Sequence, residues 1–291
     1  MNRWVSGIAI LKYLFCNFLV MTNVHATPSR SSDELVTRFS PEITTISGPF
    51  ERYGKVKIGY RATIVEYTKG KLAVFSPCPL TSTVIKEING RNVRFLIAPD
   101  LEHHIFIQSW KQSFPEASLI GPKSLYDKRV SMHKKDKNIL PLQWYALYTA
   151  ANKQNMHIEE NFDKVFDCEF IDGHINQEMV YLHKPSKTLI QADLIWNLPA
   201  KEQYSLVEHK SSNSQRFLSS IVSKMLNING SAIGQRVISW YLFAKNRESF
   251  NLSIKRIQTW DFENIIPCHG DLILGNGKEI FKKLMKWHFQ G

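Results

Sequence analysis

A chain of 291 residues is long enough for one large domain or two small ones. Its 43% hydrophobic and 12% aromatic content excludes disorder over most of its length. The formal net charge is +11, but the sequence contains no long Lys/Arg run and no aromatic-interleaved basic motif, which favours a solvated basic surface over a nucleic-acid partner.

The first 26 residues have the pattern of a secretory signal peptide. Arg3 precedes a mostly apolar stretch that ends at Met21, and Val24-His25-Ala26 resembles a cleavage site with small residues. Because Lys12 interrupts the apolar stretch, an uncleaved membrane anchor is the alternative. The pattern predicts the secretory pathway or an extracellular location, with membrane contact only through this segment if it stays attached.

Residues 27–41 are rich in Ser, Thr and charge, which predicts a linker, and the main domain is expected over 42–291. Between residues 42 and 77, short β-branched and aromatic runs alternate with Gly and charged residues, which predicts antiparallel strands. From 78 to 121 the pattern changes to helix, strand, loop, helix and strand, which is typical of α/β proteins.

The second half of the chain repeats this order of strands followed by helices. Residues 161–174 and 178–199 predict strands with turns, and residues 214–260 predict helices. Residues 264–271 read as a strand that enters a loop, and residues 277–288 as a final amphipathic helix. Two such halves that face each other would make a four-layer αββα sandwich.

Several well-known catalytic and nucleotide-binding motifs are absent: the sequence contains no GxSxG, Walker A, GxGxxG or HExxH pattern. This argues against serine hydrolases, P-loop NTPases, Rossmann oxidoreductases and zincins. What remains is a spread set of His and Asp residues that follow predicted strands: His103, His104, His174, Asp193, His269 and Asp271.

The order and spacing of these residues resemble the metallo-β-lactamase fold superfamily, in particular an uncharacterised branch known only as a domain of unknown function. The matching stretches are "FLIAPDLEHHIFI", "VYLHKPSKTLIQADLIWN" and "IIPCHGD". The resemblance covers roughly residues 42–290. It implies an α/β (α+β) fold of the αββα type, with metal ions bound in loops at one edge of the two sheets.

The first metal motif of the superfamily is His-x-His-x-Asp-His. The equivalent positions here are Pro99, Leu101, His103 and His104, so only the last histidine is kept. Because proline and leucine side chains cannot bind zinc, the resemblance implies that one of two metal positions has lost most of its ligands.

The other ligands that the resemblance implies are His174, Asp193 and His269, with Asp193 as the usual bridging carboxylate. Together with His104, and with His103 in reserve, they supply enough donors for one ion of zinc, or of iron or manganese. We therefore predict that His104, Asp193 and His269 converge within metal-bridging distance.

Residues that support the ligands are also predicted. Asp100, Glu102 or Asp271 would orient a ligating histidine by a hydrogen bond. Cys268, beside His269, reads as a small buried hydrophobe rather than as a further ligand. Of the four cysteines, the three at 78, 168 and 268 are widely spaced, so neither a disulfide framework nor a CxxC zinc pattern is present.

The first functional hypothesis is a hydrolase that uses one metal-activated water on an ester, amide, thioester or phosphoester of a small molecule. Asp193 or Asp271 would hold or deprotonate the water, and His183 or His103 would protonate the leaving group. The alternative is a catalytically inactive, metal-free binding module, in which a residue such as His183 only stabilises its hairpin. Nucleic-acid processing is a weaker third option, given the incomplete motif and the leader.

Overall fold

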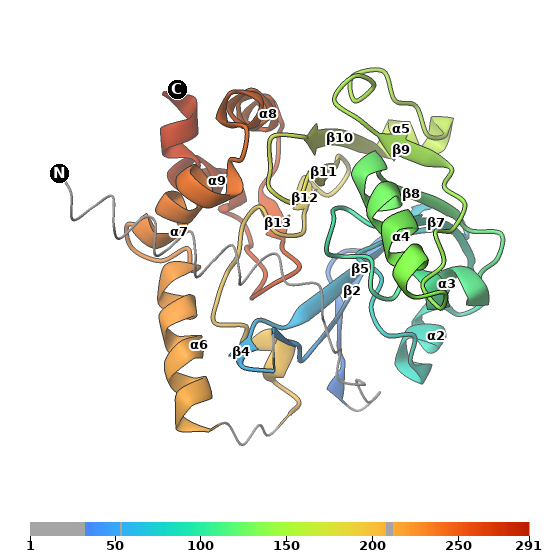
Figure 1. The fold of residues 1–291 in the computed structure, drawn as a ribbon, viewed down its shortest axis with the longest axis horizontal. Coiled ribbons are helices and arrows are strands. Elements are labelled where there is room, and N and C mark those ends of the chain that lie inside the picture. Colours follow the sequence, from blue (N-terminus) through green and yellow to red (C-terminus); the bar gives the residue numbers. More distant parts are fainter. Residues whose placement is uncertain (1–32, 53, 208–211, 291) are drawn as a thin grey trace.

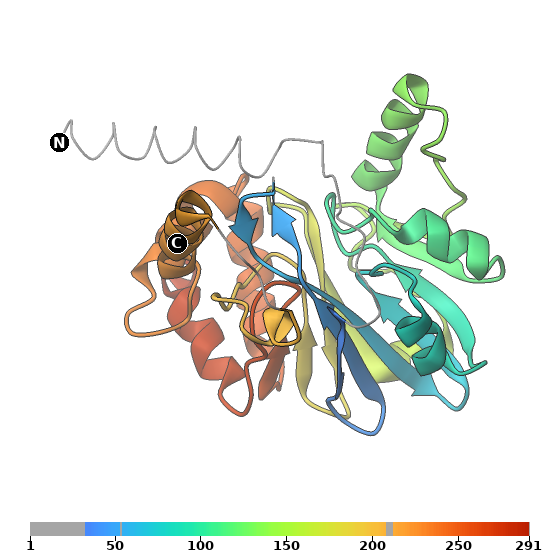
Figure 2. The ribbon, with the colours of Figure 1, turned by 90° about the horizontal axis from the view of Figure 1, so that it is seen from below.

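Two β-sheets packed face to face lie at the centre of the molecule (Figures 1 and 2). The computed structural model describes residues 33–52, 54–207 and 212–290. The larger sheet has the order β1-β2-β5-β6-β7-β8-β9. Its strands are β1 (Leu35–Arg38), β2 (Ile43–Gly48), β5 (Tyr60–Thr68), β6 (Lys71–Phe75), β7 (Asn92–Ile97), β8 (Ser118–Pro122) and β9 (Ala146–Tyr148).

The smaller sheet has the order β10-β11-β12-β13. Its strands are β10 (Phe166–Ile171), β11 (Glu178–His183), β12 (Thr188–Ile190) and β13 (Asn264–Ile266), and β3 (Glu51–Arg52) and β4 (Val56–Lys57) form a separate hairpin. Within the larger sheet, β1, β2, β5 and β6 pair antiparallel, while β6, β7, β8 and β9 run parallel.

Helices cover both outer faces of the pair of sheets, as Figure 2 shows. On the larger sheet lie α2 (Ser82–Ile88), α3 (Ile107–Ser113) and α4 (Lys123–Lys135), and α5 (Glu160–Val165) contacts both β5 and β10. The other side carries α6 (Asn213–Met225), α7 (Ile233–Ile238), α8 (Arg247–Thr259) and α9 (Gly277–Leu284). Shorter turns are η2 (Glu202–Tyr204), the π-helical η3 (Ser239–Phe243) and η4 (Lys286–Phe289).

Side-chain alternation along the strands explains the four layers. In β6, Leu72 and Val74 pack toward α2 and α3, whereas Ala73 and Phe75 face the other sheet. Because successive strand residues point to opposite faces, a strand that is apolar at every position buries both faces. The described residues form three hydrophobic clusters, one between the sheets and one under each helical layer. The predicted αββα sandwich is confirmed.

Several sequence-based boundaries need correction. The second half of the predicted linker at residues 27–41 belongs to the larger sheet, because Leu35–Arg38 pair antiparallel with β2. Helix α4 lies in a stretch for which no element was predicted, and residues 160–165 form α5 rather than the start of a strand. The predicted signal peptide or anchor at residues 1–26 lies outside the described residues and stays a prediction.

Two further observations concern the whole chain. In the part that the structure describes, no helix combines the length and the apolarity needed to cross a bilayer. The cysteines at positions 78, 168 and 268 are free thiols rather than disulfide partners.

His288 makes folding stability sensitive to acid. Its ring is buried between Trp240 and Phe250, with Nδ1 2.7 Å from Asn251 Oδ1, and burial lowers its pKa to about 4. The unfolded chain takes up this proton below about pH 6.5, so stability is lost as pH falls from there toward 4. We expect His288→Gln to reduce the slope of unfolding free energy against pH by about 1.4 kcal/mol per pH unit.

Urea unfolding of both proteins at several pH values across this window measures the two slopes. The variant also loses packing, which lowers its stability at every pH, so the slope is the relevant quantity. Equal slopes for the two proteins would show that another group binds the proton.

Candidate metal centre

The candidate site is built from loops that follow strands at one edge of the two sheets. Strands β12 and β13 are parallel neighbours with Ile190 opposite Ile266. Asp193 and His269 each come three residues after these positions, so they leave the sheet on the same side. His269 Nε2 lies 3.5 Å from Asp193 Oδ1. The sequence-based expectation that these two residues converge is therefore confirmed.

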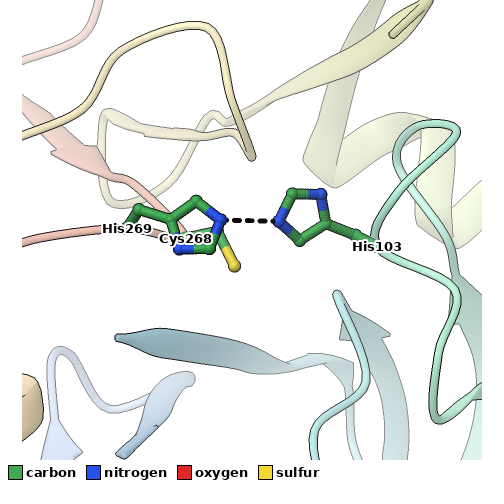
Figure 3. A group of neighbouring side chains, drawn as sticks. All are labelled: His103, Cys268 and His269. Atoms are coloured by element: carbon green, nitrogen blue, oxygen red, sulfur yellow. Dashed lines mark hydrogen bonds between the residues drawn. The ribbon is translucent and has the colours of Figure 1, made fainter. Parts of the chain in front are cut away.

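The loop after β7 brings a second histidine to the same point. His103 Nε2 lies 3.2 Å from His269 Nε2, and Figure 3 shows the two rings facing each other. Nδ1 of His103 lies 2.9 Å from both carboxylate oxygens of Asp100, and Nδ1 of His269 lies 2.7 Å from the carbonyl oxygen of Gly59. Because these oxygens accept, each Nδ1 donates a hydrogen, and the facing Nε2 atoms are left to share a proton or a metal ion.

Three buried carboxylates surround this pair of imidazoles: Asp100, Glu178 and Asp193, with exposed fractions of 0, 0 and 1%. Asp100 and Glu178 each accept two backbone N–H groups. Asp193 Oδ2 accepts from Asn176, but Oδ1 has no hydrogen-bond partner among the described residues. A buried carboxylate oxygen is costly unless it is paired, so the arrangement fits a bound cation.

The pKa values of the group reflect burial and mutual charge. Burial raises the pKa of Asp193 to about 6, against the opposing effect of His103. Burial and the neighbouring carboxylates raise the pKa of Glu178 well above its usual range. The attraction and hydrogen bond between Asp100 and His103 outweigh the effect of burial on both groups. The pKa of Asp100 is therefore lowered and that of His103 raised. Burial and the charge on His103 lower the pKa of His269. Without a metal ion, His103 therefore carries the shared proton on Nε2 and donates a hydrogen bond to Nε2 of His269.

Within the described part of the chain, two overlapping groups of donors could hold a metal ion. One contains His103, Cys268 and His269, and the other Asp100, His103 and Asp193, with the donor atoms of each group within 4.8 Å of one another. In tetrahedral zinc sites with Zn–N bonds of 2.0–2.1 Å, two nitrogens lie about 3.3 Å apart. The observed 3.2 Å between the facing nitrogens fits that geometry. The residues present therefore fit a small divalent ion.

His104 does not join these groups, which corrects the prediction that it converges with Asp193 and His269. Its Nδ1 lies 3.1 Å from the guanidinium of Arg129, which also donates to the carbonyl oxygen of Leu140. Burial and the nearby cations lower the pKa of His104 to about 3. The two histidines lie in a turn ahead of α3, where adjacent side chains diverge. His103, the reserve donor, takes the position beside His269.

His174 lies in the core rather than in either donor group. Its ring packs against Phe243 and Phe250, and its Nδ1 accepts from the backbone N–H of Asn176 at 3.2 Å. Burial lowers its pKa to about 4. Its Nε2 has no hydrogen-bond partner within the described part of the chain. The 19-residue spacing to Asp193 therefore does not place His174 among the convergent donors.

The structure also corrects two expected proton-transfer residues. His183 lies at the opposite end of β11 from Glu178, where its Nδ1 is 2.7 Å from Ser186 Oγ and its ring contacts Phe166. It therefore stabilises the hairpin, the alternative that the sequence had left open. Asp271 Oδ1 accepts from the backbone N–H of Glu202 and holds the neighbouring loop instead of joining the donor groups. Of the three residues predicted to orient a histidine, Asp100 makes such a contact, to Nδ1 of His103.

Arg61 on β5 holds the loop after β13, and sequence reasoning missed it. It is 2% exposed, and its guanidinium donates to the carbonyl oxygens of Pro267 and Gly270 at 2.6 and 2.7 Å. It also donates to Ser47 Oγ at 3.0 Å and pairs with Glu202 at 2.9 Å. No local pattern signals a contact across more than 200 positions. Glu178 was also missed: it accepts from the backbone N–H groups of Ala192 and Asp193, and its place in a strand gives no local signal of these contacts.

Gly270 is required by the backbone of this loop. Its φ is +93°, and a Cβ there would clash with the carbonyl oxygen of Asn197. Only glycine adopts this conformation without strain, so the turn that follows His269 depends on it.

A pocket adjoins the donors. His103, Cys268 and His269 form part of its wall. Most of the remaining wall is apolar or aromatic, and Arg52, Arg61 and Glu102 contribute charge. The pocket thus places apolar and charged side chains next to the convergent imidazoles.

The four αββα layers, with the candidate metal centre at one edge of the two sheets, define a metallo-β-lactamase fold. Comparison with solved structures confirms this fold. A metallo-β-lactamase from Pontibacter korlensis matches with a TM-score of 0.53 and 11% identity, over 89% of this chain and 100% of that chain. The metal-soaked Flv1 flavodiiron core from Synechocystis sp. PCC6803 matches with a TM-score of 0.58 and 10% identity, over 90% and 62% of the two chains.

Rubredoxin oxygen:oxidoreductase from Desulfovibrio gigas matches with a TM-score of 0.56 and 15% identity, over 88% of this chain and 62% of that chain. At these identities the likeness concerns the fold alone. The chain belongs to the family described as Domain of unknown function (DUF4336), whose model matches residues 51–219, more than half of the sequence. The search of curated proteins found no match to this chain.

Proposed function

We propose that this protein is a hydrolase of the metallo-β-lactamase fold that binds one divalent metal ion through His103, Asp193 and His269. The observation that carries the proposal is the meeting of two fixed imidazole nitrogens, 3.2 Å apart, beside a buried carboxylate oxygen without a hydrogen-bond partner among the described residues. Zinc accepts this combination of donors, and iron or manganese accepts His with carboxylate.

A bound ion of this kind supplies Lewis acidity and lowers the pKa of a coordinated water. The chain's own residues prepare the site for it. Asp100 and the Gly59 carbonyl orient the two rings, which keeps both Nε2 atoms turned to the centre. Asp193 Oδ1, which has no hydrogen-bond partner among the described residues, would be the carboxylate ligand beside them.

The adjoining pocket supports a small-molecule substrate. Phe50, Ile105 and Phe106 would contact an apolar portion, and Arg52 offers positive charge 3.5 Å from Glu102. We propose that the scissile group is an ester, amide, thioester or phosphoester positioned beside His103 and His269.

A metal-free binding module is the second candidate, and the same geometry gives it a specific basis. Because the pKa of His103 is raised and that of His269 lowered, a proton can close the 3.2 Å gap without any ion. In that case the pocket would bind its ligand without chemistry.

Elemental analysis of the untagged protein, beside an Asp193→Ala/His269→Ala double variant, separates the two candidates. The proposal expects about one metal ion per chain in the wild type and none in the double variant, together with chelator-sensitive hydrolysis of some model esters or phosphoesters. No metal in either protein, with unchanged circular dichroism, would favour the binding module.

A further inference from the structure

The buried Cys268 side chain lies beside the imidazoles of His103 and His269. Its Sγ is within 4.8 Å of donor nitrogens of both His103 and His269, and the side chain is 4% exposed. Figure 3 shows Cys268 and His269 reaching the site from one side and His103 from the other. Consecutive residues of a strand point to opposite faces, but here the chain has already left β13 and is turning toward Gly270.

The Cys268 thiol makes a weak hydrogen bond. Sγ donates to the backbone carbonyl oxygen of Arg61 at 3.4 Å, within the distance range of a sulfur hydrogen bond. A thiol is a weak donor, so this hydrogen bond contributes little to holding Sγ in place. Asp193 Oδ1, which has no hydrogen-bond partner among the described residues and lies 3.5 Å from His269 Nε2, is an independent sign that a cation belongs at this point.

We infer that Cys268 binds the same ion as a thiolate, so that the centre contains sulfur as well as nitrogen and oxygen. This inference rests on the proposed function, because it needs a metal ion at His103 and His269. On binding, the Sγ–H bond breaks, an Sγ–metal bond forms, and the proton passes to solvent without any change of oxidation state. A thiolate ligand selects zinc or cobalt over magnesium or manganese.

Cys78 provides a matched control for Cys268. It is also buried, at 2% exposed, and it lines the same pocket. Its Sγ lies 3.6 Å from the carbonyl oxygen of Pro79, and it belongs to neither donor group. Serine substitution at either position makes nearly the same change in size and polarity, so only a ligand role distinguishes the two variants.

The experiment titrates the metal-free full-length protein with Co²⁺ and records its absorption spectrum. The wild type is expected to show visible bands of tetrahedral cobalt and a near-ultraviolet sulfur-to-cobalt charge-transfer band. Cys268→Ser is expected to lose the near-ultraviolet band and keep the visible bands, while Cys78→Ser keeps both. Zinc binding by Cys268→Ser is expected to weaken at least about tenfold, with about one fewer proton released per ion.

The outcomes separate this inference from the proposed function. Visible cobalt bands without a near-ultraviolet band in the wild type, or a near-ultraviolet band that survives in Cys268→Ser, would overturn the thiolate and leave the metal site standing. If no specific cobalt spectrum appears in any of the folded proteins, the metal site itself is wrong. Circular dichroism of each variant confirms that folding is retained.

Discussion

His103→Gln is expected to abolish stoichiometric metal binding, whereas His104→Gln leaves it intact. His103 presents its Nε2 to His269 at 3.2 Å, while His104 is turned toward Arg129. Loss of one imidazole from a small donor set removes a large part of the binding energy. Elemental analysis after dialysis against trace zinc measures the difference, and hydrolysis by each protein should follow its metal content.

The two variants make the same chemical change at adjacent positions. A difference in metal content between them therefore reports the different positions of the two side chains. The glutamine side chain of the His104→Gln variant would still offer an oxygen acceptor to Arg129, so folding should be retained. If His104→Gln lost the metal and His103→Gln kept it, the assignment implied by the superfamily motif would be correct and our ligand set wrong.

Arg61→Ala is expected to lower the free energy of unfolding by about 3–5 kcal/mol, because it removes a buried guanidinium that makes four hydrogen bonds. The substitution leaves the carbonyl oxygens of Pro267 and Gly270 and the Ser47 hydroxyl without this donor. Glu202 is partly exposed, so most of the loss should come from the buried carbonyl groups. Urea denaturation measures the change.

Arg61→Lys is the informative companion. A lysine keeps the charge but cannot reproduce the planar fork that reaches both carbonyls and Glu202, so an intermediate loss is expected. Because the same loop carries His269, both variants should also bind zinc more weakly than the wild type. A stability loss below about 1 kcal/mol for Arg61→Ala would show that other contacts hold the loop.

Much of the architecture follows from local pattern. In β6 and β11, runs of mostly apolar residues predict strands, and the repeated order of strands followed by helices predicts four layers. The placement of Asp193 and His269 just after strands was also visible, because strand ends are marked by the change from apolar to polar residues. These features depend on neighbours within a few positions, which a sequence displays directly.

Tertiary structure alone decided which side chains meet. His103 and His104 are adjacent and chemically identical, and only the Asp100 and Arg129 contacts send one to the site and the other away. His183 has a suitable side chain but lies at the wrong end of its strand, and Arg61 reaches its loop from more than 200 positions away. A sequence records residue type and local period, whereas the direction of a side chain in a turn depends on the distant groups that pair with it.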